Sequence, residues 1–92
     1  MILTYDPSHG IVVPDEDIEE FLIRNKDFAV IVSSGTMVDG ARALYKEGKI
    51  PVLRIFFENR ELSIDSNGRI SNWPHGFCDV ADKFLSRLAT RG

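Results

Sequence analysis

Short apolar runs separated by turn-forming residues dominate the first two thirds of the chain. Four of these runs, at residues 2–5, 10–14, 28–32 and 51–57, predict β-strands. The run at 28–32 (Phe-Ala-Val-Ile-Val) shows no alternation, which is typical of a strand covered on both faces, so it is expected in the centre of a parallel sheet. Residues 61–64 follow a polar turn and are expected to return antiparallel to 51–57.

Helical spacing appears in three other segments. Pro14, followed by acidic residues, fits the first turn of a helix that ends near Asn25. Thr36 and Asp39 fit a capping box for a second helix, which is expected to end at Gly48. A third, amphipathic helix is predicted near the C-terminus, where apolar residues repeat at helical spacing: Phe77, Val80, Ala81, Phe84, Leu85 and Leu88.

These elements define the expected fold class. The strand at 28–32, the helix after it and the strand at 51–57 form a βαβ unit. Asn67 and Gly68 can adopt the positive φ angles of a tight hairpin turn. The sequence therefore predicts a small single α/β domain over residues 1–92. It should have a mixed sheet of about five strands, a βαβ unit, a C-terminal hairpin and a C-terminal amphipathic helix.

Composition narrows the class of protein. The 92 residues, 43% of them hydrophobic, suffice for one folded core. The single cysteine, Cys78, cannot form an internal disulfide, so a cytoplasmic location is expected. No apolar run is long enough to cross a membrane. Residues 1–23 carry six acidic and no basic side chains, and the basic residues elsewhere are scattered, so binding of nucleic acid by the chain alone is not expected.

Two segments together resemble a known family. Residues 30–38 (Val-Ile-Val-Ser-Ser-Gly-Thr-Met-Val), with the helix down to Gly48, are similar to a last core strand, a switch loop and the helix that follows. Residues 64–77 (Ile-Asp-Ser-Asn-Gly-Arg-Ile-Ser-Asn-Trp-Pro-His-Gly-Phe) are similar to a Trp-Pro-x-Gly-Phe tail. This combination resembles the C-terminal end of ABC-type AAA ATPases of the RecF/OLD-related, DUF3696-like kind.

The chain lacks the residues and motifs with which that family binds and hydrolyses ATP. Gly35 stands where the family's switch loop carries a histidine, and Cys78 stands where the tail has a second phenylalanine. The chain has no G-x-x-x-x-G-K-[ST] loop to hold phosphates and no apolar strand ending in paired acids. Neither enzymatic activity nor a cofactor is expected. The resemblance implies a non-catalytic accessory or assembly module that docks on a larger partner, an ABC-type ATPase or nuclease in a phage-defence or mobile-element system.

One loop offers an alternative function. The segment Ser33, Ser34, Gly35 and Thr36 lies between a predicted strand and a predicted helix, where free amides and hydroxyls suit an anion. The chain would then be a small ligand-binding or enzymatic domain that uses this loop as an anion site. The competing interpretation is a plain connection with Thr36 as the helix cap. No metal site is expected, because the spacing of His75 and Cys78 matches no zinc signature.

Three residues near the C-terminus are candidates for contact with a partner protein. Trp73 is interpreted either as a packing anchor for the C-terminal helix or as an aromatic residue that binds a partner. Phe84 and Leu88 on the predicted C-terminal helix are the other candidate contact residues. The partner is expected to be a protein, either an ATPase-like subunit or a second copy of the chain. Contact through a sheet edge or through the C-terminal helix is expected.

Overall fold

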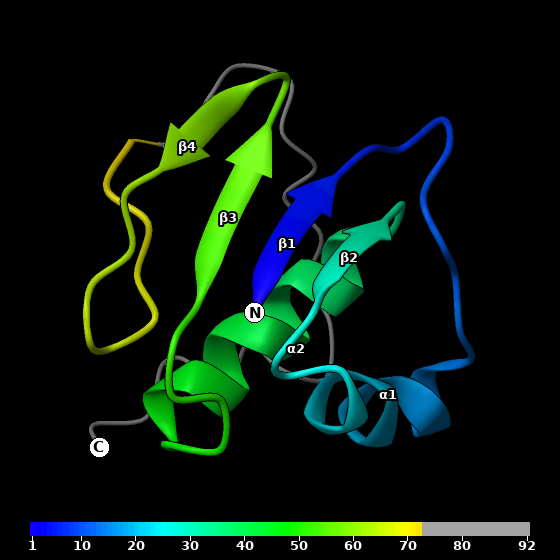
Figure 1. The fold of residues 1–92 in the computed structure, drawn as a ribbon, viewed down its shortest axis with the longest axis horizontal. Coiled ribbons are helices and arrows are strands. Elements are labelled where there is room, and N and C mark those ends of the chain that lie inside the picture. The colour runs from blue at the N-terminus through cyan, green and yellow to red at the C-terminus, as the bar shows by residue number, and fades with distance from the viewer. Residues whose placement is uncertain (73–92) are drawn as a thin grey trace.

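The computed structural model describes residues 1–72 and has a four-stranded mixed sheet (Figure 1). The strands are β1 (Ile2–Tyr5), β2 (Ala29–Val32), β3 (Arg54–Phe57) and β4 (Arg60–Leu62). Their order across the sheet is β2-β1-β3-β4. β1 pairs in parallel with both β2 and β3, and β4 pairs antiparallel with β3. The predicted mixed sheet and α/β class are thus confirmed, and within residues 1–72 the sheet has four strands where about five were expected.

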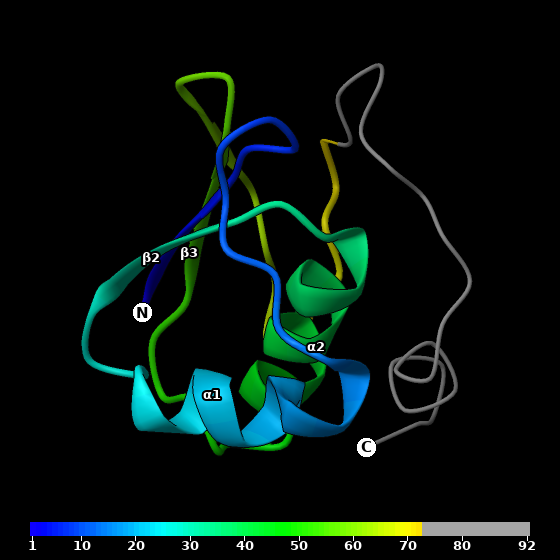
Figure 2. The same ribbon diagram turned by 90° about the vertical axis from the view of Figure 1, so that its right-hand side faces the viewer.

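Helices cover one side of this sheet. The connection from β1 to β2 contains the short 3-10 helix η1 (Asp15–Asp17) and α1 (Ile18–Arg24), and α2 (Gly35–Lys46) connects β2 to β3. α2 lies against the sheet, and α1 packs on α2 near the end where the parallel strands begin (Figure 2). The unit β2–α2–β3 is the predicted βαβ unit, with β1 inserted between its two strands.

The core lies between the sheet and these helices. Alternate strand residues point into it, and they are almost fully buried: Leu3, Tyr5, Val30, Val32, Ile55, Phe57 and Leu62. The Tyr5 and Phe57 rings lie side by side on β1 and β3 with their centroids 5.6 Å apart. Most of α2 is buried as well, including its four glycine and alanine residues, Gly35, Gly40, Ala41 and Ala43. A helix buried on nearly all sides is an internal element of a fold.

The prediction that residues 28–32 form the central strand is wrong. β2 is at the edge of the sheet, and β1 occupies the central place. The side chains of β2 alternate: Ala29 and Ile31 are exposed, and Val30 and Val32 are buried. This pattern arises because the described residues cover only one face of the sheet. The uniformly apolar run therefore leaves an apolar face that the described residues do not cover.

Residues 10–14 do not form the predicted strand. Only Ile11 bridges to β2, where its N–H donates to the Ile31 carbonyl at 2.8 Å and its carbonyl accepts from the Ser33 N–H at 3.1 Å. Pro14, which lacks an N–H, cannot extend such a ladder. The segment therefore runs along the outer edge of β2 with a single bridge and continues into η1.

Two turns close the hairpins after β3. Glu58 and Asn59 both have positive φ, 51° and 63°, as a two-residue turn between twisted antiparallel strands requires. The predicted second hairpin is present as a bridge between Ile64 and Ile70. In its loop, Gly68 has a φ of 76°. The predicted C-terminal helix lies outside the described residues.

Gly10 supplies a test of this arrangement. A Cβ at this position would overlap the backbone of Val32 and Ser33, which cannot move aside as a flexible side chain could. We expect Gly10→Ala to lower the free energy of unfolding by about 1–3 kcal/mol, measured by urea denaturation. Ser8→Ala, in the same loop and at an exposed position, is the control and should change it little. Equal stability of both variants would show that residues 10–14 are not held against β2.

Candidate functional site

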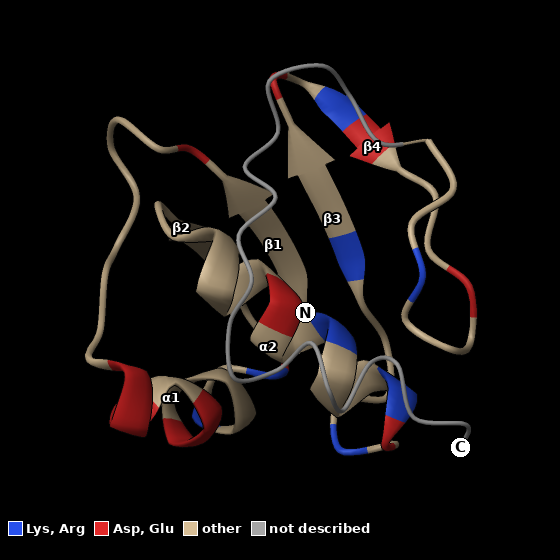
Figure 3. Cartoon of the chain, turned by 180° about the vertical axis from the view of Figure 1, so that it is seen from behind, with Lys and Arg blue, Asp and Glu red and all other residues tan. Residues whose placement is uncertain are grey.

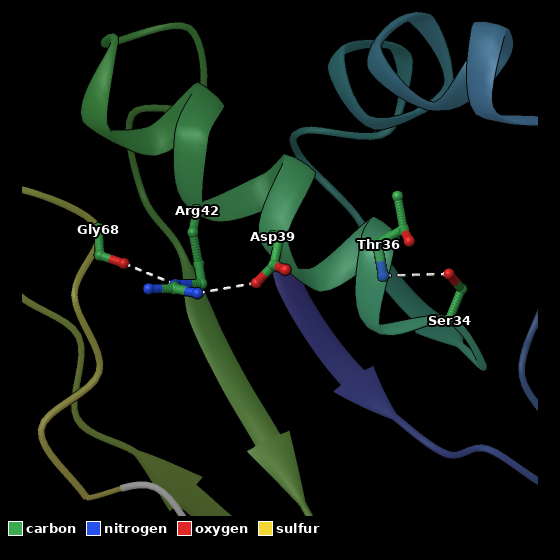
Figure 4. A network of polar contacts seen from close by, with 5 residues as sticks. All are labelled: Ser34, Thr36, Asp39, Arg42 and Gly68. Carbon is green, nitrogen blue, oxygen red and sulfur yellow. Dashed lines mark hydrogen bonds and ion pairs between the residues drawn. The ribbon is translucent and has the colours of Figure 1, made fainter. Parts of the chain in front are cut away.

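The loop from Ser33 to Thr36 lies where the sequence places it, between the end of β2 and the first turn of α2. Its details differ from the prediction, because Ser34 and not Thr36 is the N-cap. The Ser34 Oγ accepts a hydrogen bond from the Thr36 N–H at 3.1 Å (Figure 4). Gly35 is buried, and the other three residues are half-buried. The loop therefore uses its central hydroxyl to begin the helix.

The predicted capping box does not form, since Asp39 is engaged elsewhere. Its carboxylate Oδ1 lies 2.8 Å from Nη1 of Arg42, one turn later on α2 (Figure 4). The Arg42 Nε donates to the Gly68 carbonyl at 2.7 Å, 26 positions along the chain. Both side chains are about 10% exposed. This network ties the loop of the second hairpin to α2.

Sequence reasoning missed this network. The basic residues after residue 23 were described only as scattered, yet one of them, Arg42, is buried. The available signal was the spacing of Asp39 and Arg42, because acidic and basic side chains three positions apart meet on one face of a helix. We interpret the network as a structural feature because it is buried. Moving two charged groups out of water costs free energy, and only good hydrogen-bond geometry between them offsets that cost.

The face of the sheet opposite α2 is not covered by the described helices. We call it the open face and define it by the outward side chains of the four strands: Ile2, Thr4, Ala29, Ile31, Arg54, Phe56 and Glu61. Ile2 is 43% exposed and Ile31 50% exposed, although both are large and apolar. The open face is thus an apolar surface at its β2 side.

The β3–β4 side of the open face carries one ion pair. The Arg54 Nε and Nη2 donate to the two Glu61 carboxylate oxygens at 2.9 and 2.8 Å. The hydrogen bonds from Arg54 lower the pKa of Glu61, and the same bonds raise the pKa of Arg54. The guanidinium also lies 5.3 Å from the centre of the Phe56 ring. The open face therefore has no net charge.

Charge collects elsewhere on the molecule. Figure 3 shows the acidic residues of η1 and α1 gathered at one end.

At the other end, where β1 and β3 finish, there is an open hollow of about 410 Å³. Its lining includes Asp6, whose carboxylate accepts from the N–H groups of Ser8 and His9 and is therefore occupied in a turn. The hollow brings together none of the residues that the sequence singled out.

The remaining candidates fall outside the described residues. Trp73, Phe84 and Leu88 are among them, as are His75 and Cys78, so the structure does not test their roles. Within residues 1–72, no three histidine, cysteine or acidic side chains come together in a way that could hold a metal ion. None of the helices in the same range is long and apolar enough to span a membrane.

The comparisons with known proteins identify one similarity. Residues 55–88 match the family model described as a protein of unknown function, DUF3696. The match covers just over a third of the chain, and its described part contains most of β3, β4 and the second hairpin. It agrees with the DUF3696-like resemblance of the tail. No curated protein and no solved structure gives a significant match.

The buried network yields a stability prediction. Arg42→Met removes the guanidinium from the Asp39 carboxylate and the Gly68 carbonyl in a buried place. We expect a loss of about 3–5 kcal/mol in the free energy of unfolding, and a partial recovery in the Asp39→Leu, Arg42→Met double variant. Arg24→Met removes an exposed pair with Glu20 and is the matched control, with an expected loss below about 1 kcal/mol.

The measurement is chemical denaturation of the four proteins. If Arg42→Met and Arg24→Met had equal effects, the network would contribute no more than a surface pair.

Proposed function

We propose that the chain is a non-catalytic assembly module that acts by binding another protein through the open face. The observation that carries this proposal is the exposure of Ile2 on the central strand β1 and of Ile31 on the adjacent strand β2 in a largely parallel sheet. Parallel sheets are normally covered on both faces, because their strands are apolar on both sides. Here the described residues cover one face only, and a protein partner would cover the other.

The sheet edges are less suited to contact. At the β2 edge, Ile11 already uses the carbonyl of Ile31 and the N–H of Ser33. At the β4 edge, the Asn72 side chain accepts from the Ser63 N–H at 2.6 Å and donates to the Glu61 carbonyl at 3.4 Å. Edges whose backbone groups are already paired offer little to an added strand. Contact through a sheet edge, as first expected, is therefore not what we propose.

The class of larger partner comes from the resemblance. Residues 55–88 match DUF3696, and the tail resembles the end of ABC-type ATPases, whereas the sequence lacks their phosphate-holding loop. We propose that the chain serves an ABC-type ATPase or nuclease in a phage-defence or mobile-element system. Its contribution would be binding, and the partner would supply the chemistry.

A binding experiment with matched variants tests this function. The partner is a purified ABC-type ATPase with a DUF3696 tail from the same genome, and calorimetric titration measures its affinity for the chain. We expect Ile31→Lys to weaken binding strongly, because it places a charge in the apolar part of the open face. Val12→Lys should leave binding unchanged, since Val12 is 68% exposed but lies outside the sheet. Equal effects of both substitutions would reject the open face as the contact surface for the ATPase.

The second candidate function, an anion site at Ser33–Thr36, has weaker support. The Ser34 hydroxyl oxygen already accepts from Thr36, so the loop keeps fewer free groups than its sequence offers. We expect the isolated chain to show no ATP hydrolysis, because it lacks the loop and the lysine that hold phosphates. The measurement is phosphate release by repurified protein. Turnover that disappears in a Ser34→Ala, Thr36→Ala variant would overturn this expectation and favour the second function.

A further inference from the structure

We infer that the partner which fits the open face is a second copy of this chain, stacked face to face with its strands antiparallel. The inference rests on the proposed function, which makes the open face a contact surface. It goes further by naming the occupant and the residues that meet. The ATPase-type partner of the proposed function would then compete with the second copy for the open face.

The strand register divides the open face into two rows. Ile2 is paired with Ala29 on one side and with Arg54 on the other, which makes the first row. The second row runs through the next outward residues of the same strands, in the order Ile31, Thr4, Phe56 and Glu61. Each row crosses the sheet from β2 toward β4, and the rows are two residues apart along the strands.

The antiparallel dimer has a two-fold axis in the plane of the interface. This axis runs perpendicular to the strands, between the two rows, and it places the first row of one copy over the second row of the other. Ala29 then lies opposite Ile31, and Ile2 lies opposite Thr4. In both pairs a smaller side chain faces a larger one, as interdigitating sheet faces require. Because the axis exchanges the two copies, each pair occurs twice.

The charges of the open face favour the same arrangement. Across the axis, Arg54 of one copy lies opposite Phe56 of the other and next to its Glu61. Each face has one positive and one negative group, so two copies complement each other without leaving an unpaired charge. Arg54 and Glu61 have side chains 52% and 44% exposed and lie toward one side of the face, at a rim where water remains.

The acidic end of the molecule selects between the two possible directions of stacking. η1 and α1 carry five acidic side chains: Asp15, Glu16, Asp17, Glu19 and Glu20. They lie at the end where the parallel strands begin (Figures 1 and 3). Parallel stacking would bring two such ends together, whereas antiparallel stacking separates them to opposite ends of the dimer. Like charges therefore disfavour the parallel arrangement.

The test measures self-association by sedimentation equilibrium and light scattering from low to high micromolar concentration. We expect a dimer whose dissociation constant rises by about 30-fold or more in Ile31→Lys, with unchanged circular dichroism. Val12→Lys is the control and should dimerise like the original chain. A monomer at all concentrations, or equal dimerisation by Ile31→Lys, would overturn the inference.

A charge-reversal mixture tests the paired residues. Each of the variants Arg54→Glu and Glu61→Arg places two like charges on its open face, so each should dimerise poorly alone. Mixed together, they should form a heterodimer in preference to either homodimer, as native mass spectrometry can measure. A statistical mixture would overturn the antiparallel pairing of Arg54 with Phe56 and Glu61.

These outcomes separate the inference from the proposed function. A monomeric chain that binds the ATPase through Ile31 would reject the second copy as occupant and keep the open face as the contact surface. A dimer that depends on Ile31, together with ATPase binding that does not, would support the inference and place the larger partner elsewhere. If Ile31→Lys weakened neither the dimer nor the binding to the ATPase, both the inference and the proposed function would be rejected.

Discussion

The sheet depends on β1, the strand formed by the first residues of the chain. β1 lies between β2 and β3 and pairs in parallel with each of them. The ammonium group of Met1 adds a hydrogen bond of 2.7 Å to the Val52 carbonyl, 51 positions away. None of these pairings is local, because parallel neighbours must be joined by a crossover. The β1 backbone therefore joins segments that are far apart along the chain into one sheet.

Local sequence patterns predicted which segments form strands and hairpins better than they predicted the place of each strand in the sheet. The strands at residues 2–5 and 54–57 and the hairpin at 64–70 follow from apolar runs and turn residues, because those signals act over a few positions. The place of β2 at the sheet edge could not be predicted in this way. Apolar side chains at 28–32 are equally compatible with coverage on two faces and with an exposed apolar face. Only the order of the strands separates these cases, and that order depends on distant pairings.

The candidate site shows the same division. The connection of strand to helix at 33–36 was predicted, but the cap moved from Thr36 to Ser34, since neighbouring hydroxyl residues fit the pattern equally well. The burial of Arg42 could not be predicted, because its acceptor at Gly68 comes from a hairpin packed against the helix from far along the chain. The open face was missed for a related reason, since its residues come from four strands and form one surface only in the folded sheet.

The described part of the segment that matches DUF3696, residues 55–72, depends on the rest of the chain. It begins within β3 and supplies β4 and the second hairpin. Two strands and a hairpin are at best marginally stable alone. The remaining neighbours of this segment come from outside the match, since β1 pairs with β3 and Arg42 of α2 holds the loop at Gly68. Residues 1–54 therefore supply most of the core against which the described part of the family segment folds. They also supply Ile2 and Ile31, the most exposed large apolar side chains of the open face. The open face thus arises where the N-terminal strands join the matched segment, and neither part forms it alone.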